Sequence, residues 1–247
     1  MPLFPPVEST ISGADAPTVD APASRLRRGR PPKLPQNETT RGGILDAAET
    51  LFSEHGFHGV TIREVSRAGG VDSALVHYYF GTKRGLFDAV FLRRAELLNR
   101  DRLEAMNGYE LDSGTAGMTV DGVIDAFLRP LTDLAALDDP GWRSYFALVA
   151  MVNNTPAWGG ETMARYFDPV IHRLIELLRK IMPEAPATEL YYAYHMLSGS
   201  LTLTFSDTGR LDLLSGGLCR SHDFVAIHQR MVTYAAAGFR RICSPQG

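Results

Sequence analysis

The stretch that decides the fold is residues 61–83, which read TIREVSRAGGVDSALVHYYFGTK. Its first part has apolar residues at the three-residue spacing of an amphipathic helix, and Thr61 can cap that helix. Gly69 and Gly70 follow and allow a sharp turn, because glycine adopts positive φ without a Cβ clash. Asp72 can then cap a second short helix. The stretch therefore predicts two short helices joined by a glycine turn.

A third helix is expected before this pair. Ile44, Ala48 and Leu51 lie on one stripe of a helix that is predicted to begin near residue 40 and to end around Gly56. Two helices that meet at a steep angle across a glycine turn form a helix-turn-helix, whose second helix fits the major groove of DNA. The sequence thus predicts an all-α fold that starts with a three-helix, DNA-binding head.

Composition narrows the class of protein. The chain has 247 residues, 45% of them hydrophobic, which is enough for one or two domains with a buried core. No run approaches the roughly 18 apolar residues of a membrane helix, and the first residues lack the pattern of a secretion signal. Cys219 and Cys243 are the only cysteines, which suits a reducing compartment. We expect a cytoplasmic protein with no membrane partner.

The formal net charge is −3, and the charged residues are unevenly distributed along the chain. Residues 21–100 carry 13 Lys and Arg against 8 Asp and Glu. Residues 101–247 carry 12 Lys and Arg against 17 Asp and Glu. Residues 1–20 carry no Lys or Arg and 3 Asp and Glu. A basic front and an acidic back are expected when only one end of a protein meets phosphate groups.

Residues 1–40 are rich in Pro, Ala, Ser and Thr and lack apolar periodicity, so we expect a disordered arm. Within the arm, residues 25–33 read RLRRGRPPK, in which Arg28 and Arg30 flank a glycine. This core resembles an AT-hook, in which an extended Arg-Gly-Arg enters a narrow A·T minor groove. The alternative is a solvated basic linker that raises only the nonspecific affinity for DNA.

Residues 41–87 resemble the N-terminal domain of TetR-type transcriptional regulators. The glycine turn, the second helix with its aromatic end HYYF and the following Gly-Thr-Lys occur here in the order of that family. The resemblance implies that the second helix meets base edges and that the helix ends meet phosphates of double-stranded DNA. The implied base-edge residues are Ser73, Ala74 and His77, and the implied phosphate contacts are Thr61, Tyr78, Thr82 and Lys83, with Tyr79 open between a phosphate contact and packing.

Two positions depart from the family pattern. Relatives often have Ser at the cap of the recognition helix and Lys directly after it, where this chain has Asp72 and Ser73. The missing lysine removes a donor for guanine, because a bidentate contact to O6 and N7 needs Arg or Lys. We therefore expect few direct base contacts.

Residues 88–247 are expected to form a helical ligand-binding and dimerisation domain. Pro130 and Pro169 fall inside two of its helices and are predicted to kink or break them, because proline lacks the N–H of the helical hydrogen bond. The predicted helices are 120–137, 142–153, 161–182, 187–207 and 223–242, and the predicted loops are 108–117, 153–160 and 209–221.

The last two predicted helices each have a side that is nearly free of charge. Such faces from two chains can pair into a four-helix bundle, and a two-fold homodimer doubles the footprint of the recognition helix on a palindromic operator. The alternative is an ordinary intrachain core. The faces comprise Tyr192, His195, Met196, Gly199, Leu203 and Phe205 in the first helix and Phe224, Ile227, Met231, Tyr234, Ala235 and Phe239 in the second.

Bulky apolar side chains gather in residues 120–182. Kinked helices lined by Met and aromatic groups can leave a cavity for a small hydrophobic effector, although most such residues in a helical domain are simply core. The back half resembles those TetR-type regulators that respond to fatty acids or acyl thioesters, which implies a hydrophobic ligand that can be acidic. The predicted ligand-binding residues are Phe127, Trp142, Phe146, Met151, Trp158, Met163, Tyr166 and Phe167, with His172, Tyr192 and His195 as polar groups at the edge of the cavity.

The sequence gives little support for catalysis. It contains no glycine-rich phosphate loop, nucleophile elbow or zinc-protease helix. Cys219 and His222 stand three apart, but two ligands without a second pair make a poor zinc site. We expect no enzyme activity, no metal and no cofactor. The family resemblance implies a ligand-responsive repressor, and the rival interpretations are a helical carrier that does not bind DNA and a transcriptional activator.

Overall fold

The structure, a computed structural model, describes residues 38–206 and 208–244, and every regular element in them is a helix. The all-α prediction is confirmed. In that part of the chain, none of the helices has the length and hydropathy that crossing a membrane would need. The helices are α1 (Glu38–Gly59), α2 (Ile62–Ala68), α3 (Ser73–Phe80), α4 (Lys83–Gly117), α5 (Val120–Ala136), α6 (Pro140–Asn153), α7 (Gly159–Ile181), α8 (Ala187–Phe205), α9 (Arg210–Leu214) and α10 (Phe224–Ile242).

The helices α1, α2 and α3 form the three-helix head. Phe52 of α1, Val65 of α2 and Val76 of α3 are fully buried and form its small core, as their spacing in the sequence predicts. The regular part of α1 ends at Gly56, whose φ of 68° is not helical. The turn between α2 and α3 places Gly70 at φ 63°, a conformation that favours glycine. The predicted helix-turn-helix is confirmed.

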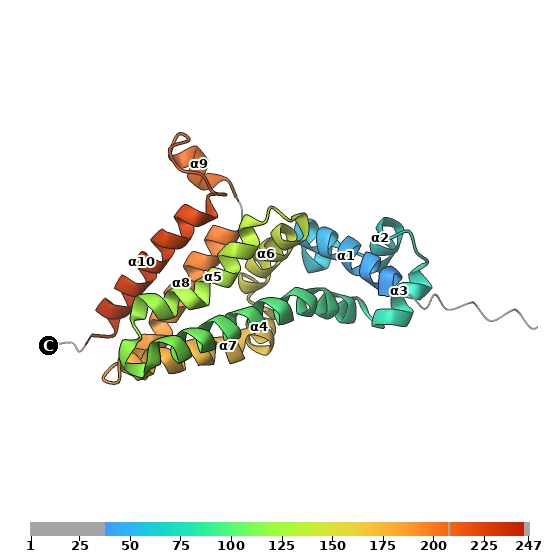
Figure 1. Cartoon of the computed structure of the whole chain (residues 1–247). Coiled ribbons are helices and arrows are strands. Elements are labelled where there is room, and N and C mark those ends of the chain that lie inside the picture. The colour runs from blue at the N-terminus through green and yellow to red at the C-terminus, as the bar shows by residue number, and fades with distance from the viewer. Residues whose placement is uncertain (1–37, 207, 245–247) are drawn as a thin grey trace, which may run out of the picture. The chain divides into compact units, whose positions relative to one another are not determined.

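The long helix α4 joins the head to the rest of the chain, the body (Figure 1). It packs against α1 and α3 near its start and against α5, α6 and α7 further along. The prediction of a loop at residues 108–117 is wrong, because α4 continues to Gly117 with one non-helical residue, Gly114. Glu110 within this stretch pairs with Arg173 and Lys180 of α7, which anchors the helix despite the low helix propensity of its glycines. The predicted domain boundary at 87/88 falls inside α4.

The helices α5, α6 and α7 complete the core of the body around α4. We predicted a kink or a break at Pro130 and at Pro169, and neither helix breaks, because α5 and α7 each continue through the proline. Leu131 and Val170, the residues that follow the two prolines, are buried in the core. The packing of the apolar stripe therefore holds each helix together despite the hydrogen bond that the proline removes.

The helices α8 and α10 pack against each other, and α10 also packs its apolar stripe on α5. The short helix α9 follows α8 in the chain and projects from the body beyond the start of α10 (Figure 1). It lies within residues 209–221, so the prediction of a loop there is wrong for Arg210–Leu214. The predicted dimer faces divide into two groups. Phe205, Met231, Ala235 and Phe239 are buried within the chain and Phe224 and Ile227 are half-buried against its core, whereas Tyr192, His195, Met196, Gly199, Leu203 and Tyr234 are exposed.

A buried carboxylate ties the head to α4. Glu49 of α1 is 2% exposed, and its two carboxylate oxygens lie 2.6 Å from Nε of Arg94 and 2.7 Å from a terminal nitrogen of Arg93. Arg93 also pairs with Asp46 of α1 at 2.8 Å. The guanidinium of Arg94 stacks on the ring of Trp142 in α6, 4.9 Å from its centroid. Three helices therefore meet at one charged cluster, which fixes the head on the start of α4.

Candidate nucleic-acid interface and ligand pocket

The start of α2 is fixed by a reciprocal cap. The backbone N–H of Glu64 donates to the hydroxyl of Thr61 at 3.3 Å, and the backbone N–H of Thr61 donates to the Glu64 carboxylate at 2.7 Å. The hydroxyl of Thr61 donates to the same carboxylate, and these hydrogen bonds lower the pKa of Glu64. Thr61 is exposed, as a phosphate contact would need. Its hydroxyl is nevertheless engaged within the chain.

The recognition helix α3 starts at Asp72, whose side chain accepts a hydrogen bond from the backbone N–H of Ala74 at 2.7 Å. The predicted base-edge residues differ in how available they are. Ala74 and His77 are exposed. Ser73 is half-buried, and its hydroxyl lies 2.9 Å from the hydroxyl of Ser66 in α2, so it also holds the two helices together.

The ring of His77 is oriented by its own helix end. Its Nδ1 lies 2.8 Å from the carbonyl oxygen of Gly81, and since a carbonyl only accepts, Nδ1 carries the proton of that hydrogen bond. In the neutral ring, Nε2 is then an acceptor. The major-groove donors that it could meet are the exocyclic amino groups of adenine and cytosine.

The aromatic end of α3 separates into an outer and an inner part. Tyr78 is 63% exposed, whereas Tyr79 and Phe80 are half-buried and pack against the core. The rings of Tyr78 and Tyr79 contact edge to face, with centroids 5.4 Å apart. The guanidinium of Arg41 in α1 lies 5.4 Å from the centroid of Phe80. Sequence reasoning missed Arg41, because only the fold shows that the start of α1 lies beside the end of α3.

The start of α4 lies directly behind the recognition helix. Thr82 is exposed and caps α4, with its hydroxyl accepting from the backbone N–H of Gly85 at 3.0 Å. Lys83 is half-buried, and its Nζ donates to the carbonyl of Val60 at 2.8 Å and lies 4.5 Å from the centroid of the Phe57 ring. A helix N-terminus and a lysine together favour an anion. Arg28 and Arg30, the predicted minor-groove residues, lie outside the described residues.

An apolar pocket, here called the inner pocket, lies among α4, α5, α6, α7 and α8. Four of the predicted ligand residues line it, so the sequence located its apolar wall in part. It encloses about 60 Å³. Its lining is Leu98, Arg102, Phe127, Leu131, Phe146, Val149, Ala150, Asn153, Met163, Phe167, Ile171, Tyr194, Ser198, Leu201, Thr202 and Phe205.

Arg102 is the charged residue of the inner pocket, and sequence reasoning missed it. Its side chain comes from α4, is 4% exposed and donates from Nε to the carbonyl of Phe127 at 3.2 Å. Burial lowers the pKa of Arg102 to about 10, so the guanidinium remains charged at neutral pH. An arginine amid polar neighbours in a long helix is typical of a surface, and the sequence carries no signal that this one is buried.

The other predicted ligand residues lie outside the inner pocket. Met151 and Trp158 line a hollow at the junction of head and body, where the Trp158 ring contacts those of Phe57 and Phe87 with centroids 5.7 and 5.4 Å apart. The three residues expected at the polar edge of the cavity do not line the inner pocket. Trp142 is buried against Tyr145 and Arg94, Tyr166 is half-buried against Phe91, and the exposed residues are His172, Tyr192 and His195.

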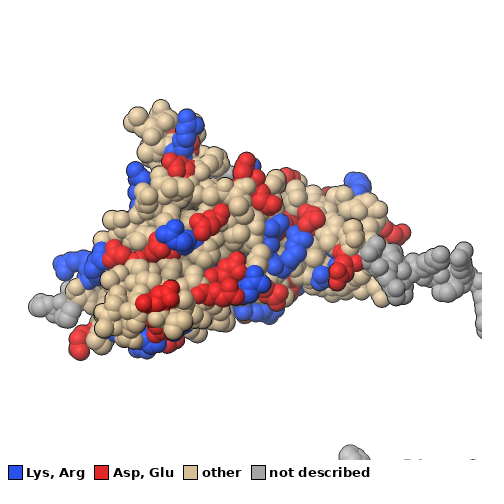
Figure 2. Space-filling view, viewed as in Figure 1, with Lys and Arg blue, Asp and Glu red and all other residues tan. Residues whose placement is uncertain are grey.

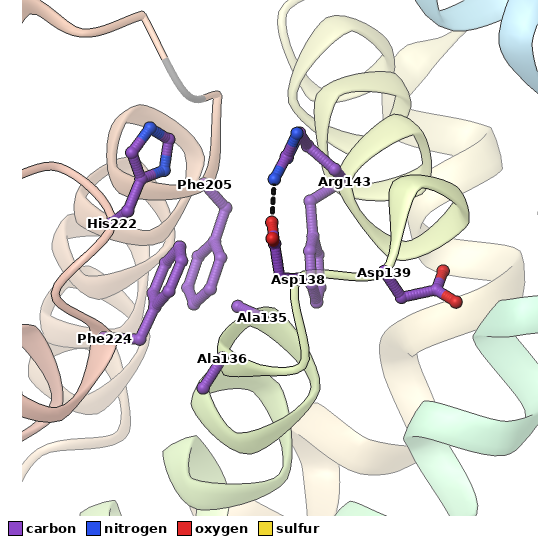
Figure 3. A pocket seen from close by; sticks show the side chains of 9 residues that line it. Ala135, Ala136, Asp138, Asp139, Arg143, Phe205, His222 and Phe224 are labelled. Atoms are coloured by element: carbon purple, nitrogen blue, oxygen red, sulfur yellow. Dashed lines mark hydrogen bonds and ion pairs between the residues drawn. The ribbon is translucent and has the colours of Figure 1, made fainter.

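A second hollow, here called the outer pocket, lies where the ends of α5 and α8 meet the starts of α6 and α10 (Figure 3). It holds about 330 Å³, and Arg143 pairs with Asp138 at its rim. The rings of Phe205 and Phe224 stack, with centroids 5.7 Å apart. Phe146 and Phe205, whose centroids are 4.9 Å apart, line both pockets. This ring pair is therefore the wall that the two pockets share.

A helix-turn-helix head on a long helix that also lines an apolar pocket defines a class of DNA-binding protein with a helical body. Comparison with known families gives the same result. The family model described as bacterial regulatory proteins of the tetR family matches residues 44–90, and the one described as tetracyclin repressor-like, C-terminal domain, matches residues 125–238. The chain belongs to the TetR family of transcriptional regulators.

Individual relatives agree with this assignment. The HTH-type transcriptional regulator BetI of Agrobacterium fabrum is 33% identical over 75 residues, which are 30% of this chain and 36% of that protein. BetI of Escherichia coli O45:K1 is 27% identical over 179 residues, 72% of this chain and 88% of that protein. The chain spans 36% and 37% of the length of the first two curated relatives that it matches.

Solved structures share the fold. The fatty acid degradation regulator FadR from Bacillus halodurans superposes with a TM-score of 0.59 at 16% identity, covering 80% of this chain and 98% of that chain. At 16% sequence identity, this similarity shows only that the two chains share the arrangement of their helices. The chemistry of the pocket has to be argued from the residues of this chain.

Proposed function

We propose that the protein is a ligand-responsive repressor that binds a palindromic operator as a homodimer in the cytoplasm and is released by a small hydrophobic molecule. One observation carries the proposal: α4 begins at Thr82 and Lys83, directly after α3, and further along supplies Leu98 and Arg102 to the inner pocket. A single rigid element therefore belongs to both sites.

The size of the inner pocket gives the ligand a way to act on α4. Its 60 Å³ is well below the roughly 300–1,000 Å³ of typical ligand pockets, so an occupant has to part the surrounding helices. The head follows α4, because Glu49 pairs with Arg93 and Arg94 across the α1–α4 contact. Coupling of this kind is worth about 1–3 kcal/mol, or roughly 5- to 150-fold in operator affinity. The ligand must bind the two states unequally to have this effect.

The homodimer is proposed to form through the exposed faces of α8 and α10. Tyr192, Met196 and Leu203 of α8 and Tyr234 of α10 are large, apolar or aromatic and exposed. Leu213, Leu214 and Leu218, in and after α9, add to this exposed apolar surface. Such a surface on a monomer is typical of an interface. Two heads held about 34 Å apart would enter successive major grooves.

The test begins with DNA selected by the full chain from a random-sequence pool. A thermal-shift panel of acyl, aromatic and steroid-like compounds then identifies ligands, since a ligand at 100 times its Kd adds about 2.7 kcal/mol of apparent stability. We expect a stabilising ligand to weaken binding of the selected DNA by roughly 5- to 150-fold. A ligand that stabilises the protein and leaves the DNA affinity unchanged would contradict the proposal.

The two rival interpretations, a carrier and an activator, differ in how well they agree with the family assignment. A carrier without DNA binding does not agree with membership of a family of transcriptional regulators. An activator would share the head, the dimer and the pocket. A reporter gene placed behind the selected DNA distinguishes the two, because deletion of a repressor raises expression and deletion of an activator lowers it.

A further inference from the structure

Among the described residues, the buried acidic and basic side chains lie beside a side chain that can carry the opposite charge, with one exception. Glu49 has two arginines, and Nε2 of the buried His228 lies 2.8 Å from the carboxylate of Asp125. Arg102 forms no ion pair with any residue in the described ranges, and of its five N–H donors only the Nε–H has a protein acceptor there. Its guanidinium otherwise lies against the face of the Phe127 ring, 4.0 Å from the centroid.

An unpaired cation in an apolar environment is costly. Burial of a charge without a partner costs several kcal/mol, and an apolar side chain of similar volume would avoid that cost. The contact with the Phe127 face offsets part of it, because a ring face attracts a cation by about 2 kcal/mol when desolvated. An anion that binds beside the guanidinium offsets a further part of the cost.

The wall of the inner pocket also offers a second donor. Tyr194 of α8 is a lining residue, and burial raises the pKa of its phenol, which keeps the O–H protonated. Asn153 donates to Thr202 at 2.6 Å, so each of these two lining groups already has a partner within the chain. The remaining lining is mainly apolar. A ligand with one anionic group and an apolar body matches this set of residues.

We propose that the inner pocket binds a small organic carboxylate, with the carboxylate paired to Arg102 and the apolar body against Phe127, Met163 and Phe167. This inference rests on the proposed function, because it names the ligand class of the same pocket. A carboxylate accepts two parallel N–H bonds from a guanidinium, which gives geometry as well as charge. A body too large for the inner pocket would displace the shared Phe146–Phe205 wall and extend into the outer pocket.

The test uses the full chain, isothermal titration and thermal shift. Octanoate is compared with octanamide, which has the same body without the charge, and benzoate and butyrate serve as probes of a ring and of a short chain. We expect octanoate to bind wild-type protein at least about tenfold more tightly than octanamide, a difference of about 1.4 kcal/mol. Equal binding of octanoate and octanamide would overturn the proposal, as would failure of all the carboxylates to bind.

Variants of Arg102 assign the effect to this residue. Arg102→Met should lose the preference for octanoate over octanamide without loss of the Tm of the ligand-free protein, because it removes an unpaired buried charge. Arg102→Lys keeps the charge and lacks the planar guanidinium, so it should retain part of the preference for octanoate. It is the test variant if Arg102→Met does not fold. The matched control Arg220→Met changes an exposed arginine beyond α9 and should bind octanoate as wild type does. Full octanoate preference in Arg102→Met would overturn the proposal.

Operator binding separates this inference from the proposed function. If octanoate binds through Arg102 and leaves the affinity for selected DNA unchanged, the ligand class stands and the coupling to DNA does not. If octanamide releases the DNA as well as octanoate does and Arg102→Met responds like wild type, the ligand-responsive function stands and the carboxylate assignment is overturned.

Discussion

At the residue scale, the contacts inside the head limit which side chains are available for DNA. The hydroxyls of Thr61 and Ser73 are engaged with Glu64 and Ser66. His77 is exposed, and its ring is held by the carbonyl of Gly81. With no Arg or Lys in α3, base discrimination by this helix depends on few groups. We regard His77 as the principal one.

We predict that His77→Ala relaxes specificity at one base pair per half-site. The loss of one base contact should cost about 1–3 kcal/mol on the preferred sequence and leave the salt dependence of binding unchanged. Anisotropy titrations against single-base variants of the selected DNA measure the effect. His172→Ala, in an exposed position on α7, is the control. Uniform weakening across all the variants would show that His77 contacts phosphate or only supports the helix end.

At the element scale, the helix-turn-helix was predictable because its signals are local. The spacing of Val65 and Val76, the glycine turn and the caps all lie within one short stretch. The length of α4 was not predictable, because Gly108, Gly114 and Gly117 are typical of a loop. The contacts that anchor this stretch are long-range, since Glu110 pairs with Arg173 and Lys180 of α7. The burial of Arg102 has the same origin, since five helices from separate parts of the chain create the inner pocket.

We predict that Glu49→Gln weakens the attachment of α1 to α4. Breaking a fully buried pair costs about 3–5 kcal/mol, and because the side chains of Arg93 and Arg94 remain 28% and 18% exposed, we expect about 2–3 kcal/mol here. Urea unfolding measures the loss. Glu54→Gln, an exposed change on the same helix, should cost less than about 0.5 kcal/mol. Equal stability of the two variants would show that the cluster does not hold the head.

At the scale of the whole molecule, the positive charge lies mainly outside the helical head. Residues 38–87 carry five Lys and Arg against six Asp and Glu, whereas residues 25–33 carry five Lys and Arg and no acid. On the face of the molecule in Figure 2, basic and acidic side chains are interspersed. We therefore expect the segment 25–33 to supply much of the charge that attracts DNA.

We predict that removal of residues 1–35 weakens DNA binding and reduces its salt dependence by about 0.9 for each phosphate contact that is lost. If Arg28 and Arg30 enter the minor groove, sites with A·T flanks should lose more affinity than sites with G·C flanks, because A-tracts have the narrower groove. Titrations on the two sets of DNA decide between the alternatives. Equal losses would identify the segment as a basic linker.

The most direct test that the head binds DNA is the salt dependence of its affinity for the selected DNA. This dependence is compared among wild type, Lys83→Ala and Arg220→Ala. If the end of α3 and the start of α4 face the phosphates, affinity falls steeply with salt for wild type, and Lys83→Ala lowers the slope by about one. Arg220→Ala, an equal loss of charge far along the chain from the head, should leave the slope unchanged. An affinity that does not depend on salt, or a Lys83→Ala slope equal to that of wild type, would contradict the account.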